Sequence, residues 1–157
     1  MTLEELYDLV GRSLFAELAY LDETGFPTVR RVFCTWHQGL GTHLISTNTS
    51  SWHVAALRRD GRASLYFADS QRFEGLCLAG EVQVCTDRAH RELLWHEGDE
   101  KYYPQGVEDQ DYCVLEFHAR SGRFYRFDGI GDLTGEDLAA FDSDKKLTDR
   151  YDGLVES

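Results

Sequence analysis

Prolines, methionine and long apolar runs are scarce in this sequence of 157 residues, which has two prolines and one methionine. No run approaches the ~18 apolar residues that a membrane-spanning helix needs. Residues 1–8 lack the basic and apolar regions of a secretory signal. The four cysteines are widely spaced and form no CxxC pair. We therefore expect a cytoplasmic protein with free thiols and no membrane span.

Basic residues are also in the minority, because 16 lysines and arginines face 28 acidic residues and the net charge is −12. Such a field repels nucleic acid, so we expect no nucleic-acid partner. The charge is uneven. Residues 27–63 hold five arginines and one acid, whereas residues 128–157 hold nine acids and three bases.

Hydrophobic residues make up 42% of the chain and aromatic residues 13%, which is typical of a folded globular protein. The length corresponds to about one domain. We divide it into a domain at 1–128 and an acidic tail at 129–157, partly helical or disordered, with the last dozen residues frayed.

Capping residues and apolar periodicity predict the elements. Residues 16–47 are expected to form a three-strand meander in which the second strand pairs with the third. Ser121 and Gly122 are expected to turn one strand into the next. The predicted helices lie at 3–15, 51–59, 87–95 and 134–141, and the strands at 16–21, 28–36, 43–47, 63–68, 76–85, 112–119 and 123–127. This order predicts a mainly β (α+β) fold, a six- to seven-stranded antiparallel barrel with peripheral helices.

The segment from Ser46 to Ser51 runs from a strand into a helix, and five of its six residues carry a hydroxyl group. The first turn of a helix has unpaired N–H groups that attract anions. Arg30 and Arg31 lie on the preceding strand, and one of them beside this helix would form a phosphate site. The alternative is that these residues only cap the helix and that the arginines are solvated.

The chain contains, in this order, the runs PTVRRVF, HLISTNTSSWHVAAL, RASLYFAD and GLCLAGEVQV. These runs resemble the pyridoxamine 5'-phosphate oxidase-like superfamily of FMN-binding split β-barrels. A later run, LLWHEGDEKYYPQGVEDQDYCVLEF, resembles the general stress protein 26-like group more specifically. The match covers roughly residues 3–127.

The resemblance implies a homodimer with FMN at the subunit interface. Arg30 and Val32 match the family's Arg-x-Val pattern, Thr47 matches the threonine at the end of the strand, and Ser51 matches the serine that opens the helix. The flavin ring would lie along the two strands, and Trp95, Tyr102 and Tyr103 could wall it. The cofactor-binding residues that we expect are Arg30, Val32, Ser46, Thr47, Asn48, Ser51, Trp52 and His53.

Two departures from the family pattern bear on function. Trp52 and His53 stand where the family usually has two basic residues, and each charge-assisted hydrogen bond lost there is worth about 1.5–3 kcal/mol. The end of the chain lacks the arginine- and histidine-containing segment of true pyridoxamine 5'-phosphate oxidases, so that reaction is not expected.

We therefore expect a flavin-dependent oxidoreductase acting on an unidentified small-molecule redox substrate. No catalytic acid or base is visible, and the flavin would carry the chemistry. The alternative is a non-catalytic protein that binds a flavin, a deazaflavin or haem, with His53, His96 or His118 as an axial ligand. No two of the six histidines are spaced for a helical metal site, so no metal site is expected.

Overall fold

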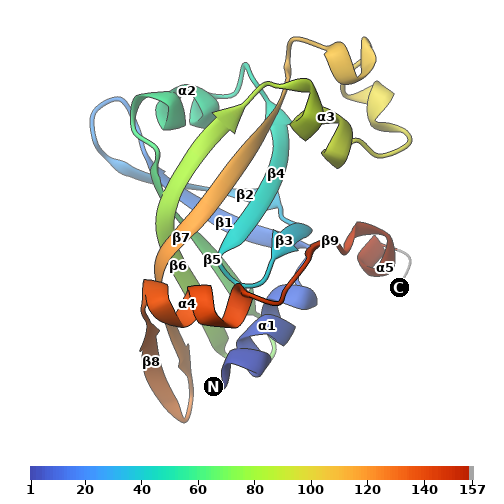
Figure 1. Ribbon diagram of the computed structural model, residues 1–157. Helices are drawn as coiled ribbons and strands as arrows, with labels where there is room; N and C mark the ends of the chain where they lie inside the picture. The colour runs from blue at the N-terminus through green and yellow to red at the C-terminus, as the bar shows by residue number, and fades with distance from the viewer. Residues whose placement is uncertain (156–157) are drawn as a thin grey trace.

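The protein is built around one antiparallel sheet of nine strands that curls into a split barrel (Figure 1). The computed structural model describes residues 1–155. The strand order is β2-β1-β5-β6-β7-β4-β3-β9, and β8 pairs with β7. The elements are α1 Leu3–Gly11, β1 Phe15–Leu21, β2 Pro27–Phe33, β3 Trp36–Gln38, β4 Thr42–Asn48, α2 Trp52–Arg59, β5 Arg62–Asp69, β6 Glu74–Cys85, α3 Arg88–Leu94, β7 Tyr112–Arg126, β8 Gly129–Leu133, α4 Gly135–Asp142, β9 Leu147–Asp149 and α5 Tyr151–Val155.

This architecture confirms the predicted antiparallel split barrel with helices outside it. Figure 1 shows α2 and α3 at one end of the barrel and α1 and α4 at the other. The sheet has more strands than the expected six or seven, because short pairings at β3, β8 and β9 extend it. No helix in the described part of the chain is long and apolar enough to span a membrane.

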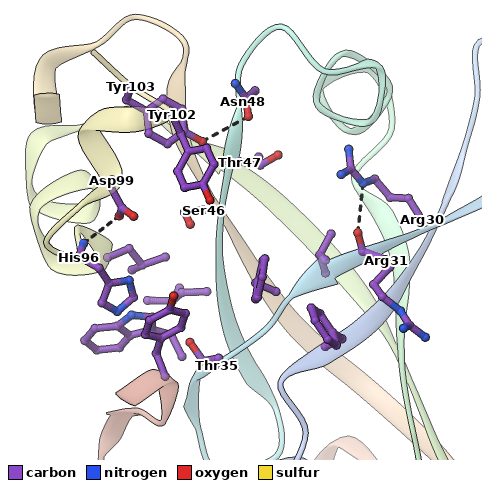
Figure 2. Close-up of a pocket in the computed structure, with 17 residues that line it drawn as sticks. Arg30, Arg31, Thr35, Ser46, Thr47, Asn48, His96, Asp99, Tyr102 and Tyr103 are labelled. Atoms are coloured by element: carbon purple, nitrogen blue, oxygen red, sulfur yellow. Dashed lines mark hydrogen bonds between the residues drawn. The ribbon is translucent and has the colours of Figure 1, made fainter. Parts of the chain in front are cut away.

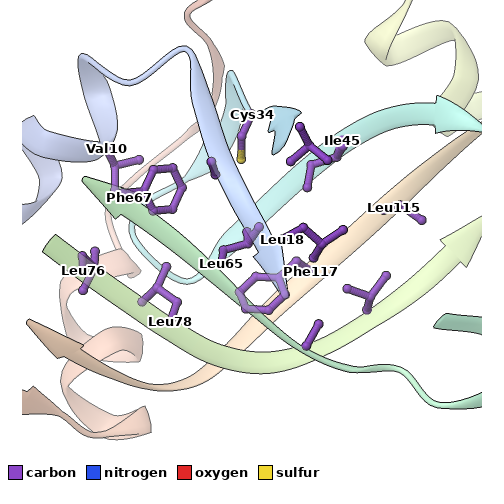
Figure 3. Packing of buried hydrophobic residues seen from close by; sticks show 14 of the residues in the cluster. Val10, Leu18, Cys34, Ile45, Leu65, Phe67, Leu76, Leu78, Leu115 and Phe117 are labelled. Carbon is purple, nitrogen blue, oxygen red and sulfur yellow. The ribbon is translucent and has the colours of Figure 1, made fainter. Parts of the chain in front are cut away.

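The core fills the barrel interior (Figure 3). On β5 and β6 alternate residues face inward, as the apolar pattern predicts, and Leu65 pairs directly with Leu78. Both side chains are fully buried, as are Phe67 and Phe117. Burying one such side chain contributes about 1.5–3 kcal/mol.

The predicted meander at 16–47 is confirmed for its first pair of strands, β1 and β2, and is wrong for the second pair. The expected second strand is divided into β2 and β3 at Cys34 and Thr35, where the Cys34 N–H bonds the Leu14 carbonyl. β2 pairs with β1 alone, whereas β4 pairs with β3 and β7. Helix α1 also stops at Gly11 rather than near 15, because Val10 is its last buried apolar residue and Phe15 already belongs to β1.

The predicted turn at Ser121 and Gly122 is also wrong. β7 continues through both residues, because they pair with Ala79 and Leu78 of β6. The register of β6 and β7 shifts between Ala79 and Gly80, so Ser121 and Gly122 lie next to a β-bulge and not in a hairpin turn. The hairpin comes later, between β7 and β8.

The segment after residue 128 is joined to the barrel at both β8 and β9. Thr134 and Asp137 form the predicted capping box of α4. The expected fraying is wrong for residues 147–155, which form β9 and α5. Arg150 explains the difference, because its guanidinium donates to the carbonyls of Gly11, Ser13 and Cys34. Residues 156–157 of the predicted frayed end lie outside the described residues.

Candidate functional site

A pocket of about 410 Å³ opens where β2 and β4 diverge (Figure 2). Its walls come from these two strands, from residues 94–103 and from α5. Its volume lies within the range of small-molecule sites. The lining residues are Phe15, Arg30, Arg31, Val32, Phe33, Thr35, Trp36, Leu44, Ser46, Thr47, Asn48, Leu94, His96, Asp99, Tyr102, Tyr103 and Tyr151.

A second, more open hollow of about 600 Å³ adjoins this pocket at the start of α2. The two hollows share Arg30, Arg31 and Asn48. The open hollow contains no carboxylate among its described lining residues, which are Tyr20, Arg30, Arg31, Asn48, Ser50, Ser51, Trp52 and His53. An elongated molecule with an anionic end could therefore occupy both.

Arg30 and Arg31 point in different directions from β2, as the alternation of a strand predicts. Arg31 forms an ion pair with Glu17 on β1 at 2.5 Å. Arg30 has no carboxylate within 4.0 Å among the described residues, and its Nη1 lies 2.9 Å from Nδ1 of His53. The positive charge of Arg30 is thus directed to the open hollow and is not neutralised by an acid.

His53 is buried between Arg30 and Thr47. Because Arg30 can only donate, Nδ1 of His53 must accept, and the proton on Nε2 is donated to Oγ1 of Thr47 at 2.9 Å. Burial and, to a smaller extent, the Arg30 charge together lower the pKa of His53 to about 4. His53 is therefore neutral at pH 7 and orients Arg30. It does not supply the positive charge that the family usually has at this position.

The start of α2 differs from the sequence interpretation in one further respect. Ser51 is the N-cap residue but its hydroxyl makes no capping hydrogen bond. Trp52 is 90% exposed, so little of its side chain contacts the other described residues. Ser51, Trp52 and His53 all line the open hollow, so the start of α2 borders it.

Asp111 holds the loop before α2 in place, and sequence reasoning missed it. Its carboxylate accepts from the Asn48 side chain and from the Ser50 N–H, both at 2.8 Å, and these bonds lower its pKa. The Asp111 carbonyl also accepts from the Thr49 N–H. Asp111 lies more than sixty residues from this loop in sequence, so no local pattern could have linked them.

The aromatic wall contains two of the three predicted residues. Tyr102 is 65% exposed at the mouth, and Tyr103 is buried with its hydroxyl 3.4 Å from Oδ1 of Asn48 (Figure 2). Trp95 lies outside the pocket lining and packs edge-on against Tyr112. Trp36, which the prediction missed, contributes a buried indole N–H with no acceptor among the described residues.

The opposite wall is completed from the end of the described chain. Nε2 of His96 lies 2.7 Å from Oδ2 of Asp149, and the His96 ring stacks on Tyr151 at 4.5 Å between centroids. Thr35 donates to the other oxygen of Asp149 at 3.0 Å. The acidic tail therefore contributes side chains to the site, which its composition did not indicate.

The remaining candidates are distributed as follows. Val32, Ser46, Thr47 and Asn48, four of the expected cofactor-binding residues, line the main pocket. Of the three histidines considered for haem, His96 lines that pocket, while His118 is exposed on β7 beside Thr42. All four cysteines are free thiols, as expected.

Comparison with known proteins identifies the family of the chain. The profile of the family described as pyridoxamine 5'-phosphate oxidase like matches residues 35–131. A Clostridium acetobutylicum protein related to general stress protein 26 of Bacillus subtilis is 35% identical; the match covers 87% of this chain and 96% of that one, with a TM-score of 0.78.

Two more distant structures share the fold. A haem-binding protein from Mycobacterium smegmatis is 22% identical, with a TM-score of 0.70, over 88% of this chain and 60% of that one. A pyridoxamine 5'-phosphate oxidase-related, FMN-binding protein from Nostoc punctiforme is 14% identical, with a TM-score of 0.64, over 82% and 86%. No curated protein matched. The chain belongs to the pyridoxamine 5'-phosphate oxidase-like family.

Proposed function

We propose that this protein binds FMN and acts as a flavin-dependent oxidoreductase on a small-molecule redox substrate. The observation that carries the proposal is Arg30, a cation without an acidic partner among the described residues, held by His53 beside a hollow that Ser50 and Ser51 also line. A phosphate group suits such a position, because charge-assisted hydrogen bonds are the strong ones.

The adjoining pocket suits the rest of the cofactor. It is continuous with the phosphate hollow through Arg30 and Asn48, and Val32 and Tyr103 give it apolar and aromatic surface. The orphaned N–H of Trp36 is a buried donor that a heterocyclic ring could satisfy. These residues fit FMN.

The chain's own residues would bind and orient the cofactor. FMN would supply hydride chemistry through its ring when bound. Arg30 and Ser51 would hold the phosphate, and the β2 and β4 backbones would position the ring. Asp111 would keep the Asn48–Ser50 loop in place, and the Asp149–His96 pair would fix the imidazole at the pocket wall.

The proposal includes a homodimer in which a second subunit closes the pocket. β2 is an edge strand with one neighbour, so its outer backbone groups are available for pairing. Phe15 and Phe33 lie beside the pocket with their rings 4.9 Å apart, and 40% and 55% of their surfaces are exposed. Four free thiols support the cytoplasmic location that we propose with it.

The first test is a visible absorption spectrum of the purified protein after addition of excess FMN and gel filtration. We expect a flavin band near one per chain, and about 10- to 100-fold weaker binding in Arg30→Gln, since one charge-assisted bond is worth about 1.5–3 kcal/mol. Arg59→Gln is the matched control, because Arg59 is half-exposed and pairs with Glu23. A protein that retains no flavin, or equal loss in both variants, would contradict the proposal.

A second candidate is a non-catalytic protein that binds haem or a deazaflavin. Haem binding is favoured by His96, whose ring lines the pocket and is oriented through Nε2 by Asp149. A haem-binding protein also shares the fold. A Soret band that persists on gel filtration and disappears in His96→Ala, with no retained flavin, would support this candidate instead.

A further inference from the structure

A cluster of three chemically different side chains lies on the outer face of the barrel, at the ends of β6 and α3. The thiol of Cys85, a ring nitrogen of His90 and a carboxylate oxygen of Glu116 all lie within 4.8 Å of one another. None of the three lines the main pocket between β2 and β4. Thiolate, imidazole and carboxylate are the three side-chain ligands that proteins offer to zinc.

The sheet register places two of these residues on one face. Cys85 pairs with Val114 and Gln83 pairs with Glu116, so Cys85 and Glu116 are diagonal neighbours across β6 and β7. His90 comes from the first turn of α3, which packs against β7. Three elements therefore meet at the cluster.

Asp87 fixes the orientation of the His90 ring. Nδ1 of His90 lies 2.8 Å from both oxygens of the Asp87 carboxylate, and Nε2 points to Oε1 of Glu116 at 3.5 Å. A metal-bound histidine commonly donates its other N–H to a carboxylate in this way. Nε2 is thus the nitrogen available to a cation.

The distances agree with a tetrahedral centre. Two ligand atoms about 2.1 Å from a tetrahedral zinc lie about 3.4 Å apart, close to the 3.5 Å between Nε2 of His90 and Oε1 of Glu116. Zinc–sulfur geometry requires about 3.6 Å to each of these atoms, so the thiol distances need to shorten by at most about 1.2 Å.

We propose that Cys85, His90 and Glu116 bind a zinc ion, with water in the fourth position. The charges around the cluster suit a divalent cation, because Glu116 and Asp87 bring two carboxylates to His90. Binding transfers the thiol proton of Cys85 to solvent. Burial and the two carboxylates raise the pKa of that thiol to about 11, so the metal must displace a firmly held proton.

Zinc at this position would connect α3 to β6 and β7. Cys85 already packs with Leu94 of α3 in a small cluster separate from the main core. Leu94 lines the FMN pocket, and His96 follows two residues later. The metal would therefore stabilise the pocket wall from behind without contacting a ligand inside it.

The test uses cobalt(II) and zinc(II) with the reduced, purified full chain. We expect one cobalt per chain, tetrahedral d–d bands and a thiolate-to-cobalt charge-transfer band, all removed by added zinc. The charge-transfer band should be absent in Cys85→Ser and retained in Cys77→Ser, a half-buried thiol on the same strand. Retention of the band in Cys85→Ser, or no saturable binding in the wild type, would overturn the proposal.

Two further variants define the ligand set. Asp87→Asn retains a good helix cap but weakens the bond that orients His90, so we expect roughly 10- to 100-fold weaker metal affinity. His90→Gln should lose binding, whereas His118→Asn should retain it. The reverse result for the two histidines would overturn the assignment. Circular dichroism of each variant verifies that the fold is intact.

Discussion

Nδ1 of His53 lies 2.9 Å from Nη1 of Arg30, and this contact fixes both the tautomer of the imidazole and the direction of the guanidinium. The neighbouring residue, Trp52, makes no comparable contact and is 90% exposed. Two adjacent departures from the family pattern therefore have different consequences. His53 is buried and hydrogen-bonded to Arg30 and Thr47, whereas Trp52 is exposed and could be replaced without loss of buried contacts.

A basic residue at position 52 should strengthen FMN binding. In Trp52→Lys the ammonium group would reach the open hollow, and no buried packing would be lost. We expect about tenfold higher affinity, the lower end of one charge-assisted hydrogen bond. Flavin fluorescence titration measures it. Unchanged affinity would mean that the phosphate does not lie beside α2.

A basic residue at position 53 should destabilise the fold. His53→Lys places an ammonium group beside Arg30 in a buried position and removes the acceptor for its guanidinium. We expect a loss of about 3 kcal/mol in the free energy of unfolding, measured by urea denaturation. His53→Gln, which can still accept and donate, is the milder control. Equal stability of both variants would contradict the orienting role of His53.

Acid should destabilise the fold between about pH 6.5 and pH 4. Burial lowers the pKa of His37 and His53 to about 4 and of His43 to about 3. In this pH range these histidines are protonated in the unfolded chain but neutral in the folded chain. The free energy of unfolding therefore rises with pH by about 1.4 kcal/mol per pH unit for each histidine. His90 has a raised pKa and opposes the trend. Urea midpoints at pH 7.5 and pH 5 measure the slope, which should fall in His53→Gln.

Arg150 should be important for stability although it lies near the end of the described chain. Arg150→Met removes three donors and leaves the carbonyls of Gly11, Ser13 and Cys34 without them. We expect a loss of roughly 2–4 kcal/mol and faster proteolysis after residue 142. Arg59→Met, at a half-exposed position, should change stability by less than about 0.5 kcal/mol. Similar losses in both variants would contradict the argument.

Gly80 should not tolerate a side chain. A Cβ atom there would lie 2.0 Å from the His118 carbonyl oxygen, a backbone atom that cannot move alone. Gly80→Ala should therefore destabilise the fold by about 1–3 kcal/mol or more. Gly11→Ala, where no atom lies within 4 Å, is the control. Thermal unfolding of the two variants compares them, and an unchanged Gly80→Ala would mean that the bulge is not rigid.

The parts of the fold that could be predicted depend on local physics. The alternation on β5 and β6 reflects one buried face, and the Thr134–Asp137 capping box is satisfied within a single helical turn. Ser121 and Gly122 misled the prediction, because a glycine near a bulge and a glycine in a turn look alike in one sequence.

The site was predictable in position but not in role. Arg30, Thr47 and His53 lie together as the pattern indicated, yet the pattern could not show that His53 is buried and neutral. Asp111 and Tyr151 were missed for another reason. Each reaches the site across more than fifty residues, and pairing at that distance leaves no periodic signal in the sequence.

The pairing of β3 with β9 has a consequence for synthesis. Thr35 and Asp149 are 114 residues apart in the chain, and the His96 contact also depends on Asp149. A ribosome making about 5–20 residues per second would expose the β2 side of the pocket for several seconds before the segment that closes the other wall emerges. A ligand that arrives during that interval would meet only one wall of the cleft, so we expect tight binding only after residues 147–151 have joined the other wall.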